Sequence, residues 1–284
     1  MTLWTGASIV MLATIFWLNA VIIATPYIAY LLGAGFENVS SRKKRVVTGL
    51  LLLVISTLYF FIKVGSFADE GVAGIVDPMY IRFIWEGPVG QFVQFQTLVA
   101  ALWIISTVVA LPFIKWGTYS LTIALMSWSF LSIGHGSDAA WWGKAVLLLH
   151  LLVAWLWFGS LNMLRKLTTF GSVADIKKVM ERFGLHMSFA VPILLTAGFV
   201  MYRSATGQWL PQLPLTAYDV ALLTKIAVVA LILSVAALHK LKFVPQLNNE
   251  QATKRLKKSI TVEMVLAATI FIAASALSSA FSPS

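Results

Sequence analysis

The sequence contains no cysteine, which excludes disulfide bonds, thiolate metal sites and iron–sulfur clusters. Charged residues are scarce as well, at 11% of the 284 residues, whereas a soluble domain carries about 25%. Hydrophobic residues make up 59%, and the mean hydropathy is +0.86. A chain with so little charge cannot cover a surface that faces water. We therefore expect an integral membrane protein.

Strand-like alternation of polar and apolar residues is absent, and the apolar runs are long enough to be transmembrane helices. Each span needs roughly 20 residues, and its backbone must satisfy its own hydrogen bonds inside the lipid. The sequence predicts an all-α bundle of about eight spans, near residues 8–34, 46–64, 95–114, 118–135, 141–162, 183–202, 217–239 and 259–281. We expect one membrane domain over residues 1–284.

The basic residues predict the orientation, because lysine and arginine gather in cytoplasmic loops. Sixteen of the 21 basic residues fall on one side of the predicted bundle: Arg42, Lys43, Lys44, Arg45, Lys115, Arg165, Lys166, Lys177, Lys178, Arg182, Lys240, Lys242, Lys254, Arg255, Lys257 and Lys258. Both termini are then on the outer side. Because the net charge of +10 is confined to short loops, it indicates no nucleic-acid partner. The N-terminus lacks a basic n-region and a small-residue cleavage site, so we expect a retained helix.

Two predicted loops are longer than a connection requires. The outer loop 65–94 follows the second of the three helices in residues 1–114. It would be either a lid or an interfacial segment that places Tyr80 and Trp85 at the lipid headgroups. The inner loop 164–182 is cationic and amphipathic, so we expect it to lie on anionic lipid of the bilayer.

The four histidines all fall in the last five predicted spans, where an ionisable group is costly and by default marks a functional site. His135 stands between two glycines, and His150 lies about 13 Å into its helix at about 1.5 Å per residue. We predict a metal site on the outer side from these two imidazoles, on a hairpin of residues 118–162. A second site at the inner side would use His186 and His239. For each histidine the alternative is a structural hydrogen bond.

Other side chains extend the predicted outer site. Asp138 would be a ligand, would orient one, or would cap the following helix. Met201 and Met126 fall in the outer halves of their helices, where they serve either as thioether ligands or as core filler. Thioether with imidazole suits Cu(I), and carboxylate with imidazole suits Cu(II) or Zn(II).

Three more charged residues lie in predicted spans. Lys225 and Glu263 are expected at different depths, so a direct ion pair between them is not expected. Lys225 would instead snorkel outward or reach Asp219. We do not expect it to be a metal ligand, because its positive charge repels a cation.

Two regions resemble the copper-resistance D (CopD) family of membrane proteins. In the first, "GHGSDAAWW" followed by "LLHLLVAWLWFGSL" looks like the family's histidine-bearing hairpin. The second is a core over residues 178–283, which contains "ERFGLHMSFAVPILLTAGFVMYR" and "LTAYDVALLTKIAVVALILSVAALHKLKFVPQL". The points of resemblance are Arg182, Phe183, Thr196, Tyr218, Lys225, Pro245 and Glu263. The sequence departs from the family pattern at His239, where relatives tend to carry asparagine, and at His186, where they tend to carry a small residue.

The resemblance implies a protein of the bacterial inner membrane that binds copper on the periplasmic side and moves it toward the cytoplasm. It also implies a periplasmic CopC-like copper-binding protein as a partner. We expect no enzymatic activity and no catalytic residue, and the chain has no GxxxxGK[ST] nucleotide-binding loop. One alternative is an electron-transfer protein that holds b-type haem between pairs of histidines. The other is a membrane partner of a copper chaperone that transports nothing itself.

Overall fold

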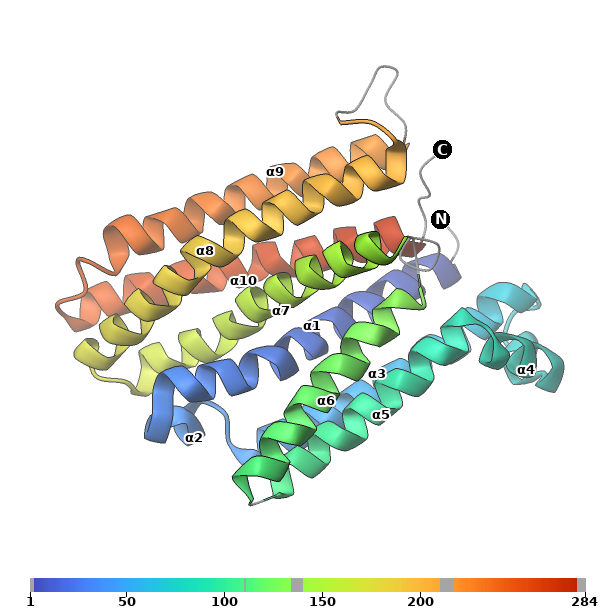
Figure 1. Cartoon of the computed structure of the whole chain (residues 1–284), viewed down its shortest axis with the longest axis horizontal. Coiled ribbons are helices and arrows are strands. Elements are labelled where there is room, and N and C mark those ends of the chain that lie inside the picture. The colour runs from blue at the N-terminus through green and yellow to red at the C-terminus, as the bar shows by residue number, and fades with distance from the viewer. Residues whose placement is uncertain (1–2, 110, 134–139, 210–216, 280–284) are drawn as a thin grey trace.

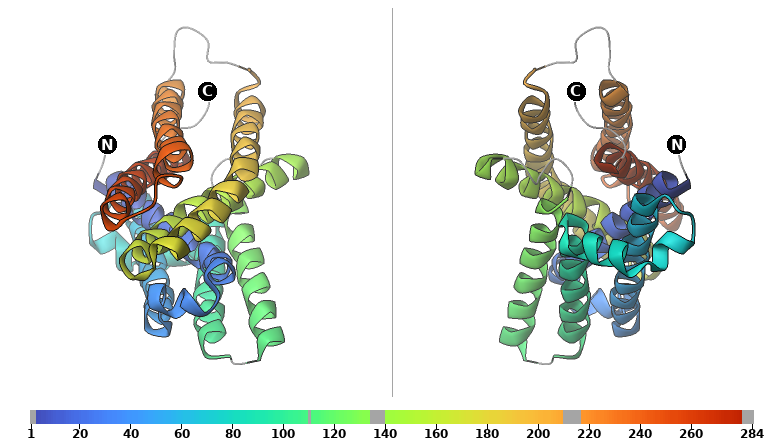
Figure 2. Two further views of the ribbon diagram at one scale, coloured as in Figure 1. Left: turned by 90° about the vertical axis from the view of Figure 1, so that its left-hand side faces the viewer. Right: turned by 90° about the vertical axis from the view of Figure 1, so that its right-hand side faces the viewer.

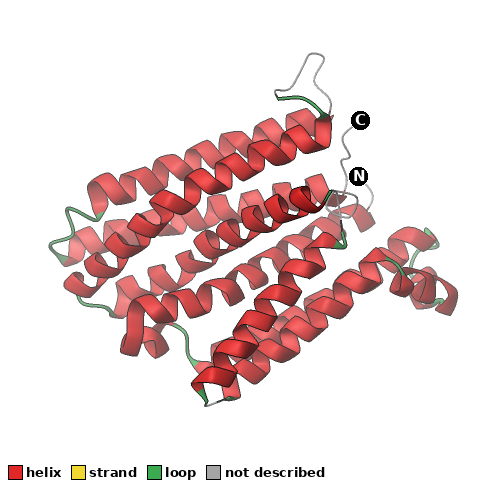
Figure 3. Ribbon diagram, viewed as in Figure 1, coloured by secondary structure: helices red, strands yellow, loops and turns green. Residues whose placement is uncertain are grey.

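The computed structural model describes residues 3–109, 111–133, 140–209 and 217–279, and all regular structure in these ranges is helical (Figure 3). The long helices are α1 (Leu3–Leu32), α3 (Arg42–Ala68), α5 (Pro88–Val108), α6 (Pro112–Leu131), α7 (Trp141–Phe170), α8 (Val173–Thr206), α9 (Ala217–Leu238) and α10 (Glu250–Ser279). The short elements are η1 (Gly33–Gly35), α2 (Phe36–Val39), η2 (Ala73–Val76), α4 (Pro78–Glu86) and η4 (His239–Phe243), a single π-helical turn.

Each of the eight predicted spans coincides with one long helix. Of the described helices, seven are long and apolar enough to cross a membrane, and α6 is less apolar than the others. The chain is therefore a multi-pass membrane bundle, while the count of eight crossings stays a prediction. The start of α1 and the end of α10 lie at the same end of the bundle (Figure 1). We call this the terminal end. We call the opposite end, where the connection from α9 to α10 lies, the cationic end.

Helix α1 runs through the middle of the bundle and separates two groups of helices (Figures 1 and 2). One group is α3, α5 and α6, and the other is α7, α8, α9 and α10. The backbones of α1 and α7 approach each other closely where a side chain at Gly159 would collide with the carbonyl oxygen of Ala20. Only glycine permits this approach, which aligns α7 with the central helix.

Aromatic side chains fill the junction between the two groups. Phe16 of α1 stacks on Phe130 of α6 at 4.9 Å between ring centroids and on Phe271 of α10 at 5.9 Å. Phe130 also meets Trp155 of α7 edge-on at 4.9 Å. Apart from this contact, α6 packs chiefly on α5, and α7 packs on α1 and α8. The expected close pairing of the two helices in the 118–162 hairpin therefore differs from the structure, in which α6 and α7 touch over a short length.

The two segments predicted as long loops are mostly helical. In place of a loop over 164–182, α7 continues to Phe170 and α8 begins at Val173, with Ser172 accepting a hydrogen bond from the Asp175 amide at 3.2 Å. Lysine, glutamate and methionine are good helix formers, so the charges of this stretch end the apolar span without ending the helix.

The segment 65–94 holds the end of α3, the start of α5 and the short helix α4 between them. Asp77 caps α4 by accepting the Met79 amide at 2.7 Å. Tyr80 donates a hydrogen bond to Glu70 at 3.1 Å, and this bond raises the pKa of the Tyr80 phenol. Trp85 packs edge-on against Phe60 at 5.5 Å. The lid and interfacial alternatives both stay predictions.

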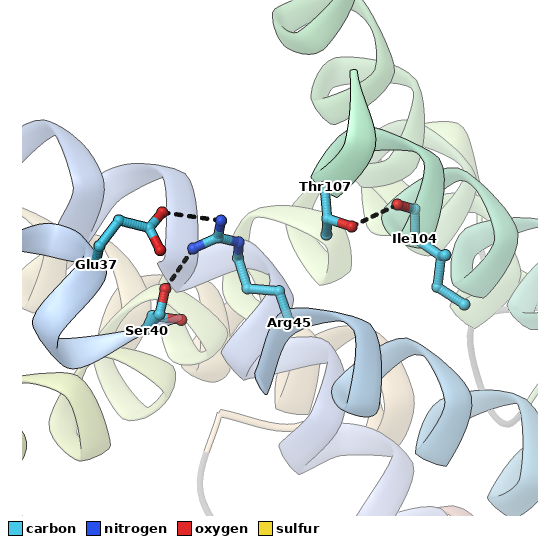
Figure 4. Close-up of polar contacts among 5 residues, drawn as sticks. All are labelled: Glu37, Ser40, Arg45, Ile104 and Thr107. Atoms are coloured by element: carbon cyan, nitrogen blue, oxygen red, sulfur yellow. Dashed lines mark hydrogen bonds and ion pairs between the residues drawn. The ribbon is translucent and has the colours of Figure 1, made fainter. Parts of the chain in front are cut away.

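Arg45 of α3 joins its helix to Glu37 and Ser40 at the cationic end (Figure 4). Its guanidinium pairs with Glu37 of α2 at 2.9 Å and donates to the carbonyl of Ser40. Its own carbonyl accepts the Trp103 indole N–H of α5 at 2.8 Å, and nearby Thr107 bonds to the backbone of its own helix. Arg45 is only 6% exposed, so this basic residue of the predicted cytoplasmic side is buried and holds neighbouring segments together.

Candidate metal centre

His150 lies in the seam between α7 and α8, nine residues after α7 begins at Trp141. At about 1.5 Å per residue this places it roughly 13 Å from the terminal end, as the sequence predicts. Its ring nitrogen Nδ1 is 3.0 Å from the carbonyl oxygen of Leu194 in α8. The predicted apolar setting holds, since most of the side chains around this seam are aliphatic. The imidazole is half-buried.

The contact with Leu194 fixes which nitrogen of His150 carries the hydrogen. A carbonyl oxygen can only accept, so Nδ1 must donate, and in the neutral ring Nε2 then holds the lone pair. Within the described part of the chain, no hydrogen-bond partner reaches Nε2. A metal-binding histidine is typically held in this way, with one ring N–H on a carbonyl and the other nitrogen open to the metal.

A glycine leaves room for this ring. A Cβ added at Gly198 of α8 would lie 3.3 Å from His150 Cε1, which is closer than ordinary contact. Met201 follows Gly198 by three residues, so it lies on the same face of α8, toward the terminal end. Of the two predicted thioethers, Met201 is the one on the helix that His150 contacts.

The rest of the predicted outer site falls beyond what the structure describes. His135 and Asp138 both lie in 134–139, outside the described residues. Among the residues that are described, no three histidine, aspartate or glutamate side chains gather closely enough to hold a metal ion. The site of His135, His150 and Asp138 therefore stays a prediction.

Met126 belongs to a different part of the bundle. It is fully buried in α6, and its carbonyl accepts the Ser129 hydroxyl at 2.7 Å. Ser129 in turn accepts from Gln96 of α5 at 2.8 Å, and Gln96 accepts from Asn19 of α1 at 3.3 Å. This chain of buried polar groups holds α1, α5 and α6 in register. The sequence analysis did not single it out, because its members are spread over 110 residues without a common motif.

His186 and His239, the predicted inner pair, contact different helices. The Nδ1 atom of His186 lies 2.9 Å from the Tyr27 hydroxyl of α1, on an exposed part of α8. His239, at the start of the π-helical turn η4, is 6% exposed and contacts α10. Their joint metal site stays a prediction.

His239 belongs to a closed set of buried partners that we call the Glu263 network: Trp157, His239, Ser259 and Glu263. One Glu263 oxygen accepts the Trp157 indole N–H at 2.8 Å, and the other is 3.0 Å from His239 Nδ1. His239 Nε2 is 2.8 Å from the Ser259 hydroxyl. Both ring nitrogens and both carboxylate oxygens are thus engaged inside the protein. This is the structural alternative that the sequence left open for His239, and it gives Glu263 a partner other than Lys225.

Lys225 lies in α9, eight residues after Ala217, so its depth of about 12 Å from the terminal end matches that of His150. Its ammonium group is near enough to the His150 imidazole for the two to interact electrostatically. The described residues offer Lys225 no hydrogen bond or ion pair. Asp219, its predicted partner, is instead 3.3 Å from the Tyr202 hydroxyl of α8, near the terminal end.

Helices α8 and α9 are linked at two places. Tyr202 and Asp219 join them near the terminal end, and Lys240 of η4, just after α9, donates to the Ser188 hydroxyl in the middle of α8 at 2.5 Å. Between these contacts the two helices touch little. Lys225 and His150 lie at the level of this loosely packed stretch.

The comparisons with known proteins give one positive result. The family model of copper resistance protein D (CopD) matches residues 177–277, from the first turns of α8 to the last turns of α10. No curated protein and no solved structure matches the chain. The matched region contains the carbonyl that orients His150, the charge of Lys225 and most of the Glu263 network. Over these residues the chain is similar to copper resistance protein D, a membrane-protein family that is not a known enzyme family.

Proposed function

We propose that this protein binds copper at His150, on the periplasmic side of the bacterial inner membrane, and moves it across the bilayer toward the cytoplasm. The observation that carries the proposal is the bond from His150 Nδ1–H to the Leu194 carbonyl, which leaves Nε2 as an open ligand inside an apolar seam. The family adds the metal, because the matched region belongs to copper-resistance proteins.

In this proposal His150 is the fixed ligand, and His135, Asp138 and Met201 complete the coordination from the terminal end. Met126 is a secondary candidate, and the inner histidines are not part of this outer site. The proposed orientation places the terminal end in the periplasm, following the distribution of basic residues. A CopC-like periplasmic protein would deliver the ion there. The ion gradient, the membrane potential or delivery itself would drive transport.

The first experiment measures metal content and visible absorption of purified protein, wild type beside His150→Ala. We expect about one copper per wild-type chain and a loss of at least about 100-fold in affinity in the variant, because a removed ligand is replaced by no other donor in the seam. His186→Ala is the matched control, since it removes an exposed histidine of the neighbouring helix and should retain copper. Unchanged copper in His150→Ala would reject the site.

The same preparation separates the two rivals. A red protein with a Soret band would indicate b-type haem and overturn the copper assignment. A colourless protein that binds copper, together with cells in which His150→Ala leaves copper accumulation unchanged, would indicate a non-transporting partner of a periplasmic copper protein. Copper accumulation that falls in His150→Ala and stays normal in His186→Ala supports transport.

A further inference from the structure

Lys225 places a positive charge at the depth of the proposed copper ligand His150. Lys225 lies in the matched family region, but it donates to none of the described side chains or carbonyls. A charge in a membrane span is costly, and it is normally paired or lies at a functional site. Lys225 is paired with no carboxylate in the described structure, so its role must come from what it repels or attracts.

His150, Lys225 and Gly198 lie at about the same depth on three different helices. His150 of α7 and Lys225 of α9 lie about 13 Å and about 12 Å from the terminal end at about 1.5 Å per residue. Gly198 of α8, which contacts the His150 ring, is eight residues from the end of its helix and so lies at the same level. The backbones of α8 and α9 approach each other little there, and the charge of Lys225 acts on the His150 imidazole.

We propose that Lys225 sets the charge of the metal that this site accepts, and that the site is selective for monovalent copper over divalent copper. This inference rests on the proposed copper site at His150. The physical reason is Coulomb's law, in which the repulsion between a fixed charge and an ion is proportional to the ion's charge. Cu²⁺ therefore pays twice the repulsion energy of Cu⁺, and the corresponding factor in affinity is squared.

Of the proposed ligands, His150 and Met201 offer imidazole and thioether, which are donors that Cu(I) accepts readily. The carboxylate of Asp138 would favour Cu(II), so the selectivity for Cu(I) depends on the charge of Lys225. The nearest carboxylate in α9 is Asp219, two turns from Lys225 and hydrogen-bonded to Tyr202. Asp219 thus lies closer to the terminal end than Lys225, about 9 Å along the helix axis at about 1.5 Å per residue. Its attraction for an ion at the level of His150 is therefore weaker than the repulsion from Lys225.

The test compares Lys225→Met with wild type in detergent-purified protein. Cu⁺ is titrated anaerobically against a competing Cu⁺ chelator, and Cu²⁺ is titrated with detection by electron paramagnetic resonance. If removing the charge raises Cu⁺ affinity about tenfold, it should raise Cu²⁺ affinity about a hundredfold, because the repulsion doubles. Lys225→Arg keeps the charge and should bind both ions as wild type does. Lys63→Met, in α3, is the control for loss of a lysine elsewhere and should change neither affinity.

Three results would overturn the inference. Equal factors for the two ions, or no change in either, would show that Lys225 does not discriminate by charge. A Lys225→Arg variant that behaves like Lys225→Met would show the same. Copper binding absent from folded wild type would reject the proposed function itself and this inference with it. Lys225→Gln is measured alongside, so that misfolding of the methionine variant does not remove the comparison.

Discussion

Two histidines of this bundle differ in how many of their ring nitrogens the protein uses. His239 is bonded through both, to Glu263 at 3.0 Å and to Ser259 at 2.8 Å. His150 is bonded through one, to the carbonyl of Leu194 at 3.0 Å. An imidazole with both nitrogens occupied acts as a link between helices. One with a single occupied nitrogen is oriented and still has a lone pair to offer.

The surroundings of the two rings follow the same division. The Glu263 network joins α7, η4 and α10 at a depth where each buried polar atom of Glu263 and His239 has a partner. Around His150 the helices α8 and α9 are loosely packed, and a lysine without a described partner lies nearby. Dense pairing is expected where polar groups stabilise the fold, and incomplete pairing where a ligand binds.

The largest expected effect is on stability at the Glu263 network. Glu263→Ala removes the acceptor of both Trp157 and His239, and breaking a buried pair in this way costs about 3–5 kcal/mol. We expect a clearly lower thermal unfolding midpoint in detergent, measured by circular dichroism. Glu250→Ala is the matched control in the same helix, because its pair with Lys254 is exposed, and it should leave the midpoint unchanged. Equal midpoints for the two variants would show that the network is not structural.

The helical spans could be predicted from the sequence because a backbone inside lipid must form its hydrogen bonds within its own segment. Each prediction depends only on the hydropathy of about 20 consecutive residues, and such a segment forms a helix whatever it packs against. The depth of His150 follows from the same local rule, since it is counted from the start of its own helix. The differences in 65–94 and 164–182 are local as well, because charged residues end an apolar span without ending the helix.

The partners of the polar residues could not be predicted in this way. Trp157 and Glu263 are 106 residues apart, and their bond depends on how α7 packs on α10. The position of α7 in the bundle depends in turn on its approach to α1, where Gly159 lies against Ala20, and no hydropathy pattern reports such a contact. The short connection between α6 and α7 favoured a hairpin, yet the aromatic junction and the α1 seam place these two helices mainly against other neighbours. The role of Leu194, a backbone acceptor, carries no side-chain signal at all.

A smaller effect is expected from crowding the His150 ring while leaving the histidine in place. In Gly198→Leu the new side chain meets the imidazole at the position where a Cβ alone is 3.3 Å from Cε1. The ring must turn away from Leu194, so we expect copper affinity to fall about tenfold, which corresponds to about 1.4 kcal/mol. The measurement is chelator competition on purified protein. Gly184→Leu in the same helix is the control, because a Cβ there meets nothing within 4 Å.

The smallest expected effect is that of His239→Asn on copper. If His239 serves the fold and His150 serves the metal, the asparagine variant should keep full copper stoichiometry with affinity within about twofold of wild type, since no ligand of the proposed site is touched. It should unfold at a somewhat lower temperature, because an amide can replace one of the two bonds of the ring and cannot span both Glu263 and Ser259. The measurement pairs copper titration with thermal unfolding in the same detergent. If the variant loses copper while its unfolding temperature is unchanged, His239 serves the metal and not the fold, and a metal ligand lies at the cationic end of the bundle.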